Sequence, residues 1–286
     1  MSKFILSAFA DEIDTKLTTQ IAVLKKYDIC HIEMRGVNGK NIVKHTINEA
    51  KEIKKQLDDN GFKISAVGSP IGKINIKDPF EPHLDLFKHT LELAKILNTK
   101  YIRMFSFFMP EKENPEIYKD DVMERWGKFI TAAKGYDIVL LHENEKDIYG
   151  DTANRCLDLV ESLNCSYVKA VFDPANFIQC NVKTYPYAYN LLKKHVVYFH
   201  IKDALSCDHS VVPSGYGDGK VKEILTEAYK EGFEGFLSLE PHLGSFQGFS
   251  DLEPNSDINK MPEGGPKQFA IAANALKKII DEIMHS

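Results

Sequence analysis

Two stretches decide the fold: VKAVFDPAN at residues 168–176 and VVYFHIKD at residues 196–203. Each opens with a run of β-branched and aromatic residues, which is typical of a buried strand. The intervening residues 184–194 have helical spacing. Strand, helix and strand in this order predict two parallel strands joined by a right-handed crossover.

The same alternation extends in both directions along the chain. Strands are predicted at residues 3–9, 30–34, 63–67, 101–106, 138–143, 168–172, 196–201 and 235–239. Helices are predicted at residues 15–27, 44–60, 82–98, 115–135, 151–164, 184–194, 220–231 and 266–284. This count favours an α/β fold, a closed (β/α)₈ TIM barrel, with a doubly wound open sheet as the alternative. No low-complexity linker interrupts the pattern, so residues 1–286 are expected to form a single domain.

Composition narrows the class of protein. Hydrophobic residues make up 43% and charged residues 27% of the 286 residues, as in soluble globular proteins. The net charge of −5 argues against a nucleic-acid partner. The five cysteines form no C-x-x-C pair, which indicates a reducing compartment. The sequence shows neither a signal peptide nor a membrane span, so we expect a cytoplasmic protein without a membrane partner.

Four consecutive predicted strands end in a residue that can bind metal: Glu143, Asp173, His200 and Glu240. In a barrel these ends converge on one mouth. A single carboxylate there is typical of a solvated or salt-bridged strand end, but four such residues on adjacent strands indicate one divalent ion. Three carboxylates and an imidazole favour Mn²⁺ as the first expectation, with Mg²⁺, Zn²⁺ or Co²⁺ as alternatives.

Several motifs resemble one known family. They are AFADEID, IEMRGVNGKNI, IRMFSFF, LHENEKDIYGD, VFDPANFIQ, FHIKDA, GYGDGKV and FLSLEPH. Together they resemble the xylose isomerase-like TIM barrel superfamily, the sugar phosphate isomerase/epimerase family, over nearly the whole chain. The resemblance implies that the four strand-end residues are the metal ligands of that superfamily. It also allows a homo-oligomer, although no residue specifies one.

The resemblance implies a divalent-metal-dependent isomerase or epimerase acting on a small sugar or polyol. Glu143 and Glu240 would be the catalytic acid/base pair, and the metal would stabilise an enediolate. The alternative is a metal-dependent dehydratase of an inosose or a dehydroshikimate-like substrate. A DNA repair endonuclease is disfavoured, because the third and fourth strand ends, AVGSP and MFSFF, lack histidine.

The chain departs from the sugar 3-epimerase pattern at two positions. Asn176 replaces a histidine and Ser206 replaces an arginine, which argues against simple ketose 3-epimerase activity. Lys202 could supply the missing cation to the substrate. Further candidates for substrate binding are Asn176, His242, Arg103, Arg35 and Glu33, with ion pairs inside the mouth as the alternative role.

Three other features allow predictions. His142 adjoins Glu143 but should point toward the helices, in a structural role. The long segments 203–219 and 241–265 follow strands, and the second could form a lid or a disordered surface excursion. The GYGDG run at 215–219 suggests either a phosphate cradle or a turn, and the turn is the simpler interpretation.

Overall fold

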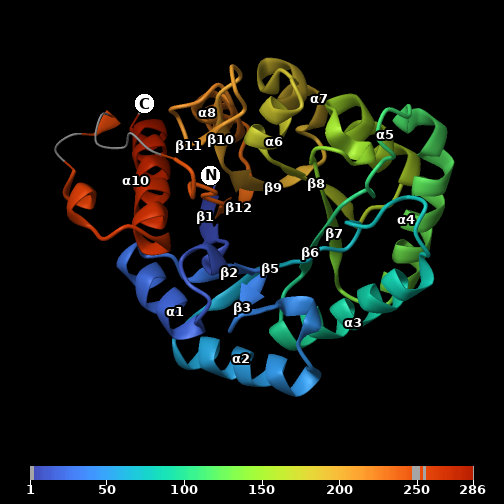
Figure 1. Cartoon of the computed structure of the whole chain (residues 1–286), viewed down its shortest axis with the longest axis horizontal. Helices are drawn as coiled ribbons and strands as arrows, with labels where there is room; N and C mark the ends of the chain where they lie inside the picture. The colour runs from blue at the N-terminus through green and yellow to red at the C-terminus, as the bar shows by residue number, and fades with distance from the viewer. Residues whose placement is uncertain (1–2, 247–251, 254–255, 286) are drawn as a thin grey trace.

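The computed structural model, which describes residues 3–246, 252–253 and 256–285, contains a nearly closed barrel of parallel strands (Figure 1). The strands are β1 (Lys3–Ala8), β2 (His31–Met34), β5 (Lys63–Gly68), β6 (Tyr101–Met104), β7 (Val139–Glu143), β8 (Val168–Phe172), β9 (Val196–Ile201) and β12 (Glu234–Leu239). Their order is β1-β12-β9-β8-β7-β6-β5-β2, and β1 also lies against β2, which brings the ends of the sheet together. The predicted TIM barrel is confirmed.

Helices surround the strands, as Figure 1 shows. They are α1 (Leu17–Lys26), α2 (Ile47–Asp59), α3 (Glu81–Leu97), α4 (Lys119–Ala133), α5 (Ala153–Leu163), α6 (Pro174–Gln179), α7 (Tyr189–Leu192), α8 (Val221–Lys230) and α10 (Gly265–Met284). Their ends follow local chemistry. Thr46 and Glu49 form a capping box at the start of α2, and Asn98 ends α3 with a φ of 55°. Among the described residues, no helix is long and apolar enough to cross a membrane.

The region after β8 differs from the prediction. The helix expected at 184–194 is a π-helical turn, η5 (Thr184–Ala188), followed by the short α7. The unpredicted α6 begins directly after Asp173, whose side chain accepts a hydrogen bond from the Asn176 backbone N–H at 2.9 Å. Pro174 supplies a φ that suits the first helical position. Asp173 is therefore fixed by the helix that it caps.

Side chains alternate between the two sides of the barrel wall. Leu141 and Val171 lie in an apolar cluster inside the barrel, and the residues two positions further on, Glu143 and Asp173, continue along that side toward the mouth. His142 points outward, with its ring 5.9 Å from that of Trp126. The outward orientation predicted for His142 is thus confirmed.

The GYGDG run is a turn built around a carboxylate of the same chain. Asp203 accepts hydrogen bonds from the backbone N–H groups of Ala204, Gly215, Gly217 and Gly219 at 2.8–3.2 Å. A Cβ atom on Gly217 would lie 2.4 Å from an Asp203 oxygen, so this position requires glycine. The amides that suggested a phosphate cradle are occupied by Asp203.

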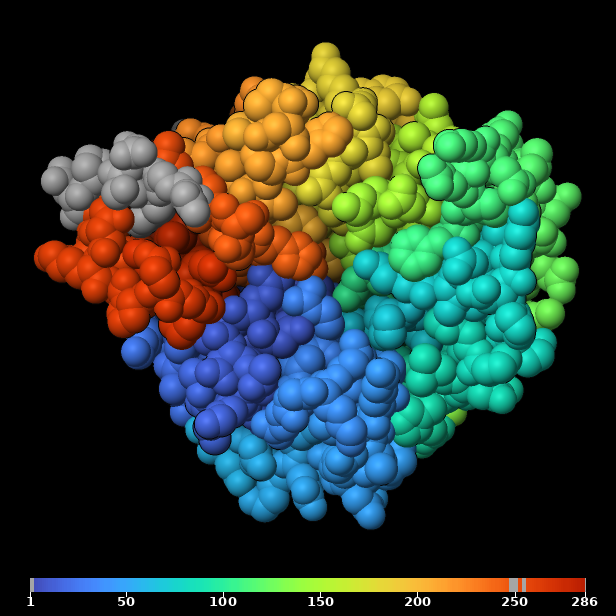
Figure 2. Space-filling model, viewed as in Figure 1, coloured from blue at the N-terminus to red at the C-terminus, as the bar shows by residue number. Residues whose placement is uncertain are grey.

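The second long segment, 241–265, is described only in part. Residues 247–251 and 254–255 lie outside the described residues, and so does that part of the predicted lid. Its remainder includes η6 (Asp257–Lys260) and lies beside α10 (Figure 1). Glu253 accepts hydrogen bonds from Tyr216 and from Lys278 of α10. The space-filling view shows N-terminal, middle and C-terminal parts of the chain meeting near the centre of one face (Figure 2).

Candidate metal centre

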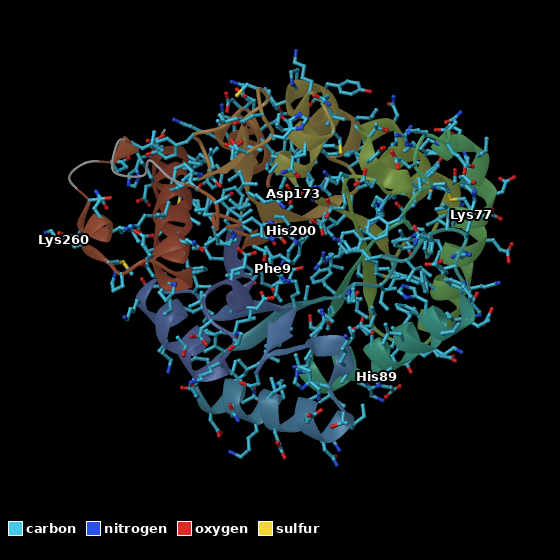
Figure 3. The ribbon with its side chains drawn as sticks, in the orientation of Figure 1. Phe9, Lys77, His89, Asp173, His200 and Lys260 are labelled. Carbon is cyan, nitrogen blue, oxygen red and sulfur yellow. The ribbon has the colours of Figure 1, made fainter. Side chains whose placement is uncertain are left out.

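Four side chains from four consecutive strands meet at one end of the barrel. Glu143 ends β7, Asp173 follows β8, His200 lies in β9 and Glu240 follows β12. Each offers one ligand atom, and these atoms all lie within 4.8 Å of one another. None of the four residues is more than 3% exposed. Asp173 and His200 lie close to the centre of the barrel, as Figure 3 shows. The structure thus brings together the four residues that were predicted as ligands.

Both ring nitrogens of His200 have carboxylate neighbours. Nδ1 lies 2.9 Å from Glu143 Oε1 and 3.8 Å from Glu240 Oε2. Nε2 faces the other way and lies 3.1 Å from Glu33 Oε2. Nδ1 is therefore the nitrogen that faces the ligand group, and Glu33, predicted at the mouth, is fully buried on the opposite edge of the ring.

Three cations balance the carboxylates. Lys202 Nζ lies 3.0 Å from Asp173 Oδ2 and 3.1 Å from Glu240 Oε2. Arg103 Nη1 donates to Glu143 Oε2 at 2.9 Å, and Arg35 Nη1 donates to Glu240 Oε1 at 3.0 Å. Buried charges require such partners, because removing an ion from water costs several kcal/mol. The ion pairs thus offset part of the cost of burying these carboxylates.

These neighbours set the protonation of the group. Burial raises the pKa of Glu143, but His200 and Arg103 outweigh it and hold that pKa at about 2. Burial likewise opposes ionisation of Glu240, and Lys202 leads the charges that bring its pKa well below the ordinary value. Asp173 behaves differently: burial raises its pKa to about 7, and Lys202 offsets this only in part. Near His200, Glu143 and Glu240 are therefore ionised at neutral pH, whereas Asp173 is only partly ionised.

The donor set fits a divalent cation. Asp173 Oδ2 is buried and, within the described part of the chain, has no hydrogen bond with good geometry, although the Lys202 ammonium lies near it. A buried oxygen without a hydrogen bond calls for an explanation, and an ion that it ligates would supply one. Three carboxylate oxygens and one imidazole nitrogen suit Mn²⁺, Mg²⁺ or Zn²⁺. Glu143, Asp173, His200 and Glu240 could therefore hold the ion.

The remaining predicted residues lie around this group. The Asn176 side chain donates to Glu143 Oε1 at 3.2 Å and to the Asn144 carbonyl at 2.9 Å, so both of its contacts serve to orient its neighbours. His242 is 44% exposed and lies 3.6 Å from Glu240. Arg103 is buried, with its guanidinium 4.5 Å from the centre of the Phe105 ring. Asn176 and Arg103 thus hold the group from the side, and His242 lies at its rim.

Asp11 and Glu12 were missed by the sequence analysis. Both bond Arg35, at 2.7 Å and 3.0 Å, and both follow β1, whose carboxyl end opens on the same mouth. Their place directly after a predicted strand was an available signal. Glu12, Glu240 and His242 form a second group close enough to hold an ion. Arg35 donates to both carboxylates and so already supplies a positive charge there.

Phe9 is a third residue without a predicted role. Its ring meets that of His200 edge to face at 5.0 Å, and Arg35 lies 4.6 Å from its centre. Figure 3 shows Phe9 beside His200. An aromatic ring in this position fixes the plane of the imidazole and closes one side of the group.

Comparison with known proteins agrees with this architecture. The family model for the xylose isomerase-like TIM barrel matches residues 21–263. No curated protein sequence matches this chain.

Three solved structures illustrate the likeness. The IOLI protein with a bound zinc atom is 17% identical, with coverage of 98% of this chain and 99% of that chain and a TM-score of 0.73. The probable 3-DHS dehydratase AsbF from Bacillus anthracis is 16% identical, with coverage of 84% and 92% and a TM-score of 0.69. An L-ribulose 3-epimerase is 14% identical, with coverage of 99% and 97% and a TM-score of 0.68. At these identities the structures show a shared fold, whereas the family model covers most of the sequence. The chain therefore belongs to the xylose isomerase-like TIM barrel family.

Proposed function

We propose that this protein is a divalent-metal-dependent isomerase or epimerase of a small sugar or polyol, and that residues 1–286 form one domain around its site. The observation that carries the proposal is the buried group of Glu143, Asp173, His200 and Glu240, whose ligand atoms lie within 4.8 Å of one another. The zinc in the IOLI structure and the reaction named for L-ribulose 3-epimerase support it. Mn²⁺ is the first ion to test, followed by Mg²⁺, Zn²⁺ and Co²⁺.

When bound, the ion would polarise a substrate carbonyl and acidify the neighbouring C–H bond. The chain's own residues move the proton. Glu143 and Glu240 are the bases, because both carboxylates are ionised at neutral pH and both belong to the group that would hold the ion beside the substrate. One carboxylate takes the proton from carbon. A proton then returns to the opposite face of that carbon in an epimerase, or to the adjacent carbon in an isomerase.

Cationic side chains near the bases would orient the substrate. Arg103 is buried, and its Nε atom has no hydrogen-bond partner among the residues that the structure describes, so the guanidinium retains a donor for a substrate oxygen. Lys202 is the second candidate donor, since its ammonium lies between Asp173 and Glu240. Arg35 and His242 would bind oxygens further out, at the rim. Asn176 is engaged with Glu143 and would act through that residue.

A metal-dependent dehydratase is the second candidate function, and Lys202 favours it. Loss of water requires a proton donor for the departing hydroxyl group, besides a base for the C–H bond. The Lys202 ammonium is 5% exposed and lies 3.1 Å from Glu240, one of the proposed bases. It could protonate the hydroxyl as the adjacent C–H bond breaks, releasing water and leaving a carbon–carbon double bond.

Exchange of Glu143 and Glu240 for glutamine tests both candidates. Ketoses, aldoses, inososes and dehydroshikimate would be incubated with the protein and Mn²⁺ in D₂O, and products analysed by NMR. Active wild-type protein should introduce deuterium at the carbon beside the carbonyl. Each of Glu143→Gln and Glu240→Gln should lower the rate at least about 100-fold.

Glu234→Gln is the matched control, since Glu234 is exposed at the opposite end of β12 from Glu240. It should leave the rate unchanged. A product with a new double bond would select the dehydratase. Near wild-type rates in both glutamine variants would contradict proton transfer by these carboxylates.

A further inference from the structure

A file of buried polar side chains lies inside the barrel beneath the candidate metal centre. We call it the polar file, and it comprises Ser7, Ser65, Tyr198 and Glu33. The Ser7 and Ser65 hydroxyls lie 2.6 Å apart, and the Ser65 hydroxyl lies 2.9 Å from that of Tyr198. Burial, and after it the charge of Glu33, raises the pKa of Tyr198 well above its ordinary value, so the two side chains are neighbours. The file ends at His200, because Glu33 Oε2 lies 3.1 Å from His200 Nε2.

The position of Glu33 is energetically unfavourable for a carboxylate. It is 0% exposed and lies beneath the mouth, among strands whose other inward side chains include Ala66, Leu141 and Val171. A buried carboxylate costs several kcal/mol unless other groups bond it. Its hydrogen-bonding neighbour is the His200 ring, whose Nε2 lies 3.2 Å from Oε1 and 3.1 Å from Oε2. Because this costly carboxylate is hydrogen-bonded to His200, we expect that it serves to hold the His200 ring.

The geometry assigns the two nitrogens of His200 to different neighbours. Nε2 faces the buried Glu33, whereas Nδ1 faces Glu143 and Glu240. A metal-binding histidine commonly donates its second ring N–H to a carboxylate, which fixes the tautomer and the orientation of the ring. Phe9 meets the ring at 5.0 Å and Tyr198 at 5.9 Å, both edge to face. The ring plane is thus restrained as well.

We propose that Glu33 is a positioning residue that accepts the Nε2–H of His200 and so presents Nδ1, without its proton, to the metal. This role differs from the substrate contact predicted from the position of Glu33 at a strand end. The inference rests on the proposed function, in which His200 is a metal ligand.

The first test measures metal binding without substrate. Zn²⁺ alone would be titrated calorimetrically into wild-type protein and into the Glu33→Gln and Ser7→Ala variants. Glu33→Gln should bind about 10–100-fold more weakly, the usual loss when a partner of a ligand is changed. Ser7→Ala is the matched control, because it breaks the same file at the end remote from His200 and should not alter affinity. Wild-type affinity in a folded Glu33→Gln protein would overturn the proposal.

The second test needs no metal. The Nε2–H of His200 should give a downfield, slowly exchanging proton signal in the NMR spectrum that is lost in His200→Ala and that, unlike a signal of the Nδ1–H beside Glu143, persists unchanged in Glu143→Gln. It should move upfield in Glu33→Gln, because an amide is a weaker acceptor than a carboxylate. If Glu33→Gln does not fold, Glu33→Asp serves instead. Aspartate is one methylene shorter, so its carboxylate lies further from Nε2 and the signal should move upfield.

The two readouts separate this inference from the proposed function. If the wild-type protein binds no divalent ion but the signal responds as described, the proposed function fails and the bond from His200 to Glu33 stands. If the signal is absent, or unchanged in both Glu33 variants, the role of Glu33 is wrong whatever the metal result.

Discussion

Two buried aspartates lie near each other and are satisfied in opposite ways. Asp173 directly follows β8, and Asp203 lies shortly after the adjacent strand β9. Both aspartates are 0% exposed. Asp203 accepts four backbone N–H bonds, two on each oxygen. Asp173 uses one oxygen to cap α6, and its Oδ2 has no hydrogen bond to any described residue, although Lys202 Nζ lies 3.0 Å from it. A saturated buried carboxylate stabilises the fold, whereas an unsaturated one weakens it and points to a bound partner.

The same contrast separates two histidines. His142 and His200 are both 0% exposed, but they lie on opposite sides of the barrel wall. His200 lies between carboxylates: burial lowers its pKa, yet Glu143 and Glu33 raise it well above the ordinary value. His142 packs against Trp126, and burial lowers its pKa to about 4. Burial alone therefore does not predict whether a histidine is protonated, because the neighbouring charges decide whether its pKa rises or falls.

The largest expected effect is on metal binding by Asp173→Asn. Asparagine can still cap α6, so the fold should keep its stability or gain some. Loss of the ligand charge should weaken Mn²⁺ binding more than about 100-fold, beyond the usual cost of changing a residue that only supports a ligand. Titration calorimetry measures the affinity. Unchanged affinity would remove Asp173 from the metal site.

The reciprocal change, Asp203→Asn, should act on stability. An amide nitrogen would replace one of two oxygens that each accept two backbone N–H bonds, leaving those donors without an acceptor. We expect the free energy of unfolding to fall by about 3 kcal/mol, the scale of lost bonds to a charged group. Urea unfolding measures it. A loss no larger than that of Asp173→Asn would break the contrast between the aspartates.

His142 makes the stability depend on pH. Its pKa is about 4 in the folded protein and about 6.5 in the unfolded chain, so the unfolded state takes up the proton first on acidification. Its stabilising contribution is therefore complete above pH 6.5 and is lost as the pH falls toward 4. The loss at pH 5 should be about 2 kcal/mol.

The His142→Gln variant isolates this contribution, because glutamine does not titrate. Urea unfolding of both proteins at pH 7 and pH 5 gives the comparison. Between these values the wild-type protein should lose about 2 kcal/mol more than the variant. An equal loss in both would show that His142 does not titrate between the folded and unfolded states.

Most of the barrel and the four ligand positions could be predicted from the sequence. Runs such as VKAVF mark strands because β-branched residues alternate with the pleat, and the pleat brings Glu143 and Asp173 to the inside. The strand at residues 168–172 agrees with β8 at both ends. Helix α6 was missed because its six residues are too few for a periodic pattern, although Asp173 followed by Pro174 is a helix start.

The sequence did not predict how deep a side chain lies inside the barrel, nor the backbone conformation of the long turns. Glu33 was expected at the mouth, since strand position fixes the side of the wall that a residue faces but not how far below the rim it lies. The four bonds to Asp203 depend on the turn at 215–219, and a sequence pattern does not give the directions of backbone N–H groups. The surroundings of Glu33 and Asp203 could therefore be determined only from the structure.

The smallest effect is expected at Asn144. This residue supports Asp173 without being a ligand, so changing it tests whether a supporting residue affects stability more than metal affinity. Its side chain accepts from the Asp173 backbone N–H and donates to the Asp173 carbonyl, both at 2.9 Å. Asn144→Ala would leave the buried Asp173 N–H unpaired, while the carbonyl would keep its bond from the Phe177 N–H at 3.4 Å, so the free energy of unfolding should fall by about 1–2 kcal/mol. The Asp173 carboxylate would keep its charge and its bond to α6, so Mn²⁺ binding should weaken by no more than about tenfold. Urea unfolding and calorimetry on one preparation measure both quantities. A loss of affinity as large as that of Asp173→Asn would mean that backbone placement, and not the carboxylate charge, dominates the metal site.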